Sequence, residues 1–334
     1  MGRLKVFVFD HLAAGGRSTR PSPQALRRQG EMLQQALLAD LEALPDVEIV
    51  RETSLNAATG PVADANPPSL PELRRFGRQF AAGVQATDAV WPLVHQSSSM
   101  LEQLSRGVLR GKRILLGSAP GAVRVAASKL KLAQVLADGG VAAVATYSPH
   151  APLPQESGPW VVKPDDGAGC LDTWLFKDRA TALAWIRASA SDGYVMQPFV
   201  AGKLGSLSLI CCDGVTQVLA CNQERVAMRD NRFHFLGSVV NGLHDEDGAL
   251  VRLAKQVAAA IPSLWGYVGV DFVLTARGAV VLDINPRLTA AYAGLHASIG
   301  CNPAGLVLDL LHGPAGMRMP ARLRRAVNVD LGLD

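Results

Sequence analysis

The segment from residue 271 to 287 holds four polar side chains whose types and spacing suit metal and phosphate chemistry. Asp271 lies inside the apolar run GVDFVL, while Asp283 and Asn285 in VVLDINPR are two positions apart and share one face of a strand. A turn between the two strands would set the aspartates side by side. Oxygen ligands without histidine or cysteine favour Mg²⁺, with Mn²⁺ as an alternative, and Arg287 would face a phosphoryl group. Against this, aspartates at strand ends often cap turns, and the arginine could form a surface ion pair.

A second candidate is the stretch WVVKPDDGAGC, from 160 to 170, where Lys163 ends an apolar run. Two aspartates and two glycines follow it. One interpretation is a surface hairpin, since short glycine-rich loops are common. The other is a phosphate-binding loop, in which the lysine supplies charge and the glycines let backbone N–H groups approach an anion.

The elements that must position these residues alternate in the first third of the chain. Strands are expected at 5–9, 47–50, 88–91 and 113–117, and helices at 24–44, 70–83 and 99–110. This order predicts a parallel sheet flanked by helices.

The rest of the chain predicts two mixed α+β regions. One helix is expected over 122–137, strands at 160–164, 173–176 and 194–200, and a helix near 179–190. Strands at 207–212, 216–226, 265–275 and 279–289, with a helix at 248–260, make up the last third. We predict domains at 1–118, 119–197 and 198–334.

The composition narrows the class of protein. The 334 residues are 49% hydrophobic and 19% charged, as in a globular protein with sizeable cores, and no apolar run is long enough to span a bilayer. Five cysteines without paired spacing favour reduced thiols and a cytoplasmic setting. A net charge of +4 with 5% aromatics argues against nucleic-acid binding and fits a small polyanionic ligand better.

Five segments, taken in order, resemble the ATP-grasp ligases. They are SKLKLA, VVKPDDGAGC, VMQPFVAG, GVDF and LDINPR. The resemblance implies an ATP-grasp fold of the α/β and α+β classes, with a Rossmann-like N-terminal domain, a small lid subdomain and a C-terminal ATP-grasp subdomain. It also implies ATP and Mg²⁺ as cofactors.

The same resemblance implies roles for individual residues. Lys163 and Arg287 would act in catalysis, and Asp271, Asp283 and Asn285 would hold the metal. ATP would contact Lys129, Lys163, Gly167, Ala168, Gly169, Gln197, Pro198, Phe199 and Val200. In the implied reaction a carboxylate receives the γ-phosphoryl group and an amine then displaces phosphate to give an amide.

Within this family, KPDDGAGC, LACNQERV and NPRLTAAYAGL resemble the tyramine–L-glutamate ligases of methanofuran-type cofactor biosynthesis. Candidate substrate residues by this resemblance are Gln96, Asn222, Gln223, Thr289 and Tyr292. Three positions depart from the pattern: Gln96 replaces an expected acid, Leu204 an expected ribose-binding carboxylate, and Ala290 an expected hydroxyl residue.

The expected activity is therefore an ATP-dependent carboxylate–amine ligase acting on small molecules, with no nucleic-acid or membrane partner and a homodimer left open. A different acid and amine pair, or a non-catalytic nucleotide-binding protein, are the alternatives. We interpret Cys211, Cys212 and Tyr267 as core packing residues. The thiol of Cys170 lies in the glycine-rich loop, where nothing in the sequence predicts a lowered pKa.

Overall fold

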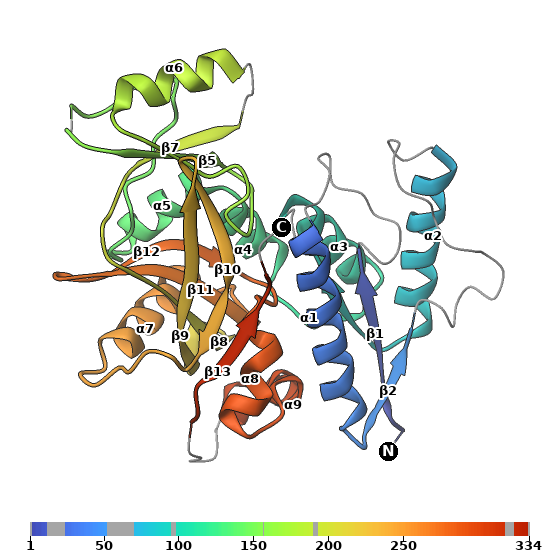
Figure 1. Cartoon of the computed structure of the whole chain (residues 1–334). Coiled ribbons are helices and arrows are strands. Elements are labelled where there is room, and N and C mark those ends of the chain that lie inside the picture. The colour runs from blue at the N-terminus through green and yellow to red at the C-terminus, as the bar shows by residue number, and fades with distance from the viewer. Residues whose placement is uncertain are drawn as a thin grey trace.

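The computed structural model describes residues 2–11, 24–51, 70–94, 98–155, 157–189, 193–317 and 324–332. Figure 1 shows an N-terminal α/β domain beside a long antiparallel sheet, with a small lid at one end of that sheet. None of the helices in these ranges is long and apolar enough to cross a membrane.

The N-terminal sheet is parallel, in the order β2-β1-β3-β4. Its strands are β1 (Leu4–Asp10), β2 (Val47–Val50), β3 (Ala89–Leu93) and β4 (Ile114–Leu115), and its helices are α1 (Gln24–Glu42), α2 (Leu70–Ala86) and α3 (Ser98–Arg110). Alternate residues of β1 pack on opposite faces: Val6 and Val8 lie in the core that α1 covers, and Phe7 and Phe9 in the core that α2 and α3 cover. The predicted parallel α/β arrangement is confirmed.

The single helix expected over 122–137 is wrong, because the chain forms two helices that meet at Ser128. These are α4 (Pro120–Ala127) and α5 (Lys129–Asp138). Ser128 has extended backbone angles, and its hydroxyl accepts a hydrogen bond from the N–H of Lys131 at 3.2 Å. Serine is a favoured helix N-cap, so the break begins a new helix at Lys129.

The second sheet is antiparallel, in the order β12-β11-β8-β9-β10-β6-β5-β7, with β13 also paired to β10. Its strands are β5 (Trp160–Pro164), β6 (Trp174–Phe176), β7 (Tyr194–Pro198), β8 (Lys203–Cys212), β9 (Val215–Arg229), β10 (Arg232–Val240), β11 (Gly266–Thr275), β12 (Gly278–Asn285) and β13 (Val327–Asp330). Helix α6 (Arg179–Ser189) packs on β5 and β6, and α7 (Ala249–Ala260) packs on β8, β9 and β12. Neither β10 nor β13 is among the strands expected from the sequence.

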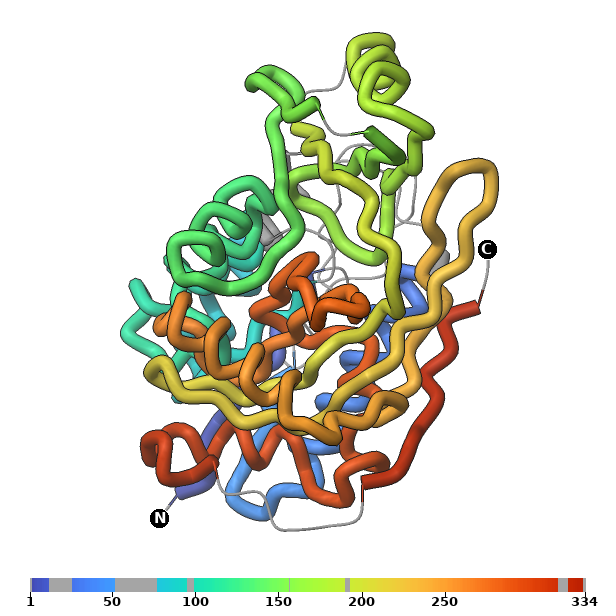
Figure 2. Tube along the Cα trace, turned by 90° about the vertical axis from the view of Figure 1, so that its left-hand side faces the viewer, coloured from blue at the N-terminus to red at the C-terminus, as the bar shows by residue number. Residues whose placement is uncertain are grey.

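The lid, made of β5, β6, β7 and α6, is joined to the rest of the sheet through the β9–β10 hairpin (Figure 2). Arg232, at the start of β10, pairs with Trp174 of β6. Its guanidinium lies 4.4 Å from the Trp174 ring centroid and donates a hydrogen bond to Asp172 at 3.2 Å. The hairpin therefore fixes the lid over the strands that carry the aspartates.

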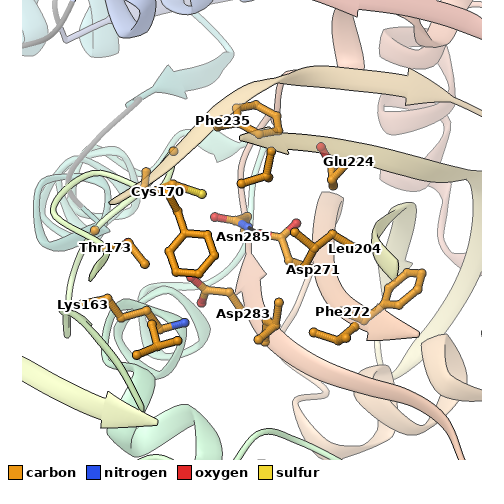
Figure 3. Close-up of a pocket in the computed structure, with 18 of the residues that line it drawn as sticks. Lys163, Cys170, Thr173, Leu204, Glu224, Phe235, Asp271, Phe272, Asp283 and Asn285 are labelled. Carbon is orange, nitrogen blue, oxygen red and sulfur yellow. Dashed lines mark hydrogen bonds between the residues drawn. The ribbon is translucent and has the colours of Figure 1, made fainter. Parts of the chain in front are cut away.

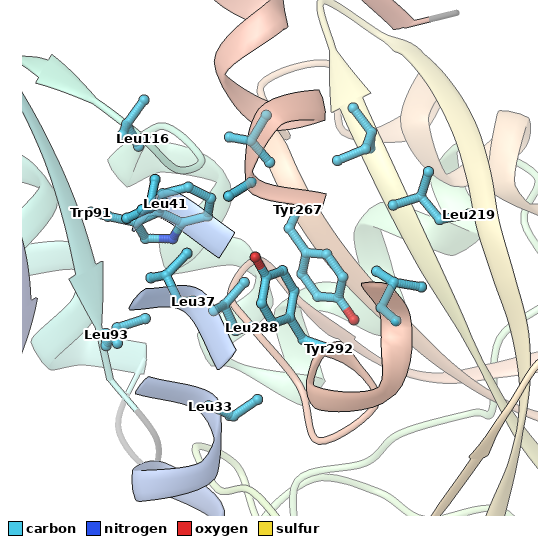
Figure 4. Packing of buried hydrophobic residues seen from close by; sticks show 14 of the residues in the cluster. Leu33, Leu37, Leu41, Trp91, Leu93, Leu116, Leu219, Tyr267, Leu288 and Tyr292 are labelled. Atoms are coloured by element: carbon cyan, nitrogen blue, oxygen red, sulfur yellow. The ribbon is translucent and has the colours of Figure 1, made fainter. Parts of the chain in front are cut away.

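A shared core holds the N-terminal domain against the C-terminal helices. Leu33, Leu37 and Leu41 of α1 lie in the same buried cluster as Tyr292 and Leu295 (Figure 4). The C-terminal helical segments are α8 (Tyr292–Ile299), α9 (Pro303–Asp309), η2 (Leu310–His312) and η3 (Pro314–Met317). This contact places α1 next to the lid loop, where Leu26 lies beside Gly169.

Candidate active site

The predicted neighbouring aspartates are brought together by the β11–β12 hairpin. Asp271 and Asp283 are directly opposite each other in the register, next to a β-bulge. Asn285 donates a hydrogen bond from Nδ2 to Oδ2 of Asp271 at 3.0 Å, and Arg287 donates one to Oδ1 of Asn285 at 2.9 Å. All four side chains line one cavity of about 240 Å³. The arrangement predicted for residues 271–287 is therefore present.

The electrostatics of this pair suit a divalent cation. Burial raises the pKa of Asp271 to about 7, helped by the nearby charges of Glu224 and Asp283 and opposed by the hydrogen bond from Asn285. The ionised form of a buried carboxylate next to other negative charges is strongly stabilised by a hard cation that both aspartates bind. No cluster of three or more His, Cys, Asp or Glu that could hold a metal occurs among the described residues. Any magnesium here would thus use two aspartates, an amide oxygen, and water or phosphate oxygens.

Two lysines face the same cavity from the lid side. Lys129, at the first turn of α5, lies 3.1 Å from Oδ2 of Asp283 and donates hydrogen bonds to the carbonyls of Asp165 and Gly167, both at 3.3 Å. Burial, and then the charge of Lys129, lower the pKa of Lys163 to about 8. Lys163 also lines the cavity, facing the aspartates (Figure 3). Lys163 therefore lies at the cavity and not on the outer surface, although β5 and β6 do pair as an antiparallel hairpin on either side of its loop.

The loop from Asp165 to Cys170 covers this end of the cavity. Oδ1 of Asp165 accepts a hydrogen bond from the N–H of Leu130 at 3.0 Å, which anchors the loop to the N-terminus of α5. Gly169 has a φ of +62°, a conformation that glycine adopts without strain. Burial raises the pKa of Cys170 to about 12, so its thiol stays protonated and is a poor nucleophile.

An apolar slot lies between the lid and the β11–β12 hairpin. The residues that line it include the expected hinge residues Gln197, Pro198, Phe199 and Val200, together with Val144, Val161, Leu204, Val273 and Leu282. Gln197 is buried, and its Nε2 donates to the hydroxyl of Thr146 at 2.8 Å. A flat heteroaromatic ring suits such a slot, because aliphatic side chains cover its faces and hinge polar groups meet its edge.

The residues predicted to contact substrate are not all in the cavity. Thr289 lines it, whereas Asn222 is fully buried beneath it and donates hydrogen bonds to Ser206 and Ser208. Gln223 and Tyr292 lie outside the cavity lining, and Tyr292 donates its hydroxyl hydrogen to Asp40 of α1 at 2.8 Å. Gln96 is outside the described residues.

Sequence reasoning missed one polar residue of this cavity, Glu224. Tyr267 packs in the core, as interpreted from the sequence, and its hydroxyl lies 2.9 Å from Thr289 and 3.0 Å from Ser208. Glu224 lines the cavity and accepts hydrogen bonds from Ser206 and, at 2.7 Å, from Ser238. Asn222 and Glu224 are two positions apart on a strand, so the sequence does indicate that they share a face. Because β10 was not expected from the sequence, it gave no indication that this face lines a cavity.

Known proteins share this architecture. Residues 126–291 match a family model described as an ATP-grasp domain. An ATP-grasp superfamily protein from Archaeoglobus fulgidus aligns over 91% of this chain and 88% of its own, with a TM-score of 0.66 and 22% identity. The L-amino acid ligase from Bacillus licheniformis aligns over 95% and 77%, with a TM-score of 0.65 and 15% identity. The chain therefore has the ATP-grasp fold.

A more particular similarity comes from a characterised enzyme. The tyramine–L-glutamate ligase of Methanocaldococcus jannaschii is 31% identical over 104 residues. These residues are 31% of this chain, and the match spans about a third (32%) of the length of that ligase.

Proposed function

We propose that this protein is an ATP-dependent carboxylate–amine ligase that joins L-glutamate to tyramine and forms γ-glutamyltyramine, a reaction of methanofuran-type cofactor biosynthesis. One observation carries the proposal: Asp271 and Asp283 are paired side by side on a cavity that Lys129, Lys163 and Arg287 also line. The partial similarity to a tyramine–L-glutamate ligase supports the choice of substrates.

The side chains divide the chemistry between them. Lys129 and Lys163 would bind the triphosphate from the lid side, and Arg287 would stabilise the charge on the transferred phosphoryl group. Magnesium between Asp271 and Asp283 would neutralise further phosphate charge. The substrate carboxylate oxygen bonds to the γ-phosphorus as the bond to ADP breaks. The amine nitrogen then bonds to the acyl carbon as phosphate leaves, and the amine's protons pass to solvent.

An assay of ADP release over amino acids and amines, with mass detection of the amide, tests this proposal. We expect ADP release to require both an acid and an amine, and glutamate with tyramine to give the largest rate. A different preferred pair would keep the ligase class and replace the substrates. ATP binding without turnover on any pair would instead favour a non-catalytic nucleotide sensor.

A further inference from the structure

One wall of the cavity carries none of the residues to which a role in binding ATP or magnesium is given above. It is formed by β9 and β10 and is called here the β9–β10 wall; its residues are Glu224, Val226, Phe233, Phe235 and Ser238. Figure 3 shows Glu224 and Phe235 along the edge of the cavity away from Lys163. The wall is apolar except for one carboxylate and one hydroxyl.

A β-bulge sets the composition of this wall. Phe235 lies opposite Val226 in the register, but beyond the bulge Ser238 lies opposite Glu224. The additional residue turns Ser238 toward the same face as Phe235, although the two are three positions apart. Ser238 then donates its hydroxyl hydrogen to Oε2 of Glu224 at 2.7 Å, while Ser206 donates to Oε1. The carboxylate is thereby fixed from both sides.

The charge of Glu224 has no cationic partner at contact distance. Among the described residues it forms no ion pair, and the neighbouring Arg225 donates instead to the carbonyl of Val329 and to Asp330. Burial raises the pKa of Glu224, because its carboxylate is held beneath the surface. Lys129 and Arg287, on the other side of the cavity, are engaged by Asp283 and Asn285. An anionic site of this kind favours a cationic ligand.

A second polar group reaches the cavity from the N-terminal domain. Gln29 of α1 is 8% exposed and lines the cavity. Its amide can hydrogen-bond to a polar group on a bound molecule. Gln29 and the β9–β10 wall together enclose the space next to Asp271.

We propose that Glu224 binds the amino group of the amine substrate in its ammonium form and takes one proton from it, which leaves the nitrogen free to attack, and that Phe233 and Phe235 cover the apolar body of that amine. This inference rests on the proposed ligase function. An acidic amino acid fits the wall poorly, because no lysine, arginine or histidine of β9 or β10 lines the cavity to meet its carboxylates. Glu224 is thus a specificity residue for the second half of the reaction.

The test separates the two half-reactions in the Glu224→Gln variant. Glutamate and ATP are supplied with either tyramine or hydroxylamine, a small nucleophile that is uncharged at neutral pH and traps the acyl phosphate as a hydroxamate. We expect the KM for tyramine to rise on the order of 100-fold, as for loss of a buried charge-assisted contact. The KM for ATP and for glutamate in hydroxamate formation should change far less. Ser238→Ala should raise the tyramine KM by a smaller factor, on the order of 5-fold, because Glu224 keeps its charge.

Glu246→Gln, an exposed site with the same chemical change, is the matched control and should leave both reactions unchanged. Equal loss of amide and hydroxamate in Glu224→Gln, with Mg-ATP thermal stabilisation intact, would place Glu224 on the acid side and overturn the proposal. An unchanged tyramine KM would also overturn it. A wild-type protein that forms no hydroxamate with any amino acid would instead overturn the proposed ligase function, which is a separate result.

Discussion

At the scale of residues, the site concentrates charges of both signs around one cavity. Lys129, Lys163 and Arg287 face Asp271 and Asp283 across one cavity. Burial moves the pKa of Asp271 up and that of Lys163 down, so each group is destabilised in its charged form until a ligand of opposite charge arrives. Because these groups are already removed from bulk water, most of their desolvation cost is met on folding and is not charged to the binding of ATP and metal.

Asp283→Asn should lower turnover by about 10²- to 10³-fold. The change removes one of the two carboxylates expected to bind magnesium, and it also removes the negative charge that contacts Lys129. Lys129 keeps the carbonyls of Asp165 and Gly167 as acceptors, so the thermal midpoint without nucleotide should shift little. The stabilisation by Mg-ATP should shrink. Thermal shift and steady-state rates at limiting magnesium measure both effects. Near-normal turnover under those conditions would show that the metal lies elsewhere.

ATP binding without metal should weaken as the pH rises from 8 to 10. The pKa of Lys163 is lowered to about 8, so its positive charge is present below that pH and is lost above it. Asp271, with a pKa of about 7, is already ionised across this window. Titration calorimetry at constant ionic strength should show at least about a tenfold loss of affinity.

Lys163→Met should bind ATP more weakly at pH 8 and lose most of this pH dependence. Lys177→Met, at an exposed lysine just after the lid strand β6, is the matched control and should behave as the wild type. An unaltered pH profile in Lys163→Met would assign the titration to another group.

At the scale of elements, the helix break at Ser128 sets the phosphate-binding end of the cavity. The cap begins α5 at Lys129, and the first N–H groups of α5 meet Asp165 of the lid loop. A helix that ran on unbroken from Ala122 would use those N–H groups internally and could not anchor the loop. The break thus joins helix and loop into one unit.

Ser128→Ala should therefore destabilise the protein and loosen the lid loop. Loss of a serine N-cap costs about 1 kcal/mol, which corresponds to a fall of about 2–4 °C in the thermal midpoint of a domain of this size. The KM for ATP should rise by a factor of a few, because Lys129 and Asp165 lose their fixed spacing. Ser263→Ala, at an exposed serine, is the control. A lowered midpoint with an unchanged KM would show that the cap stabilises α5 without organising the phosphate site.

At the scale of the whole molecule, α1 connects the N-terminal domain to both the C-terminal helices and the cavity. Asp40 of α1 accepts the hydroxyl hydrogen of Tyr292, contacts Nδ1 of His296 at 2.5 Å, and offers its carbonyl to Asn302 at 2.7 Å. Gln29, on the same helix, lines the cavity. The position of one wall of the site therefore depends on this interdomain contact.

Tyr292→Phe should lower the thermal midpoint without acting on substrate affinity directly. Burial, together with Asp40, raises the pKa of Tyr292 well above its ordinary value, so the phenol remains a donor at every working pH. Removing a buried hydrogen bond to a charged group costs about 1.5–3 kcal/mol. Calorimetry and KM values for ATP, glutamate and tyramine measure the result. A raised KM for one substrate with an unchanged midpoint would support the substrate role predicted for Tyr292 from the sequence.

The sequence by itself determined the local features of this protein. The alternation of apolar residues placed β1, β11 and β12, and the two-residue spacing of Asp283 and Asn285 fixed which side chains share a face, because strand geometry is local. The short turn made β11 and β12 neighbours, and so Asp271 could be paired with Asp283 from the sequence alone.

Only the tertiary structure decided which faces meet. Glu224 was not predicted as a cavity residue, because its surroundings come from β8 and from the bulged strand β10, and pairing between separate strands leaves no local sequence signal. Tyr292 resembled a substrate residue by its motif but is turned toward Asp40, which lies 252 positions away in the chain. Gln29 reached the cavity only because α1 packs against α8. Contacts between residues so far apart in the sequence depend on how whole domains pack, and the spacing of apolar residues along the chain does not indicate that packing.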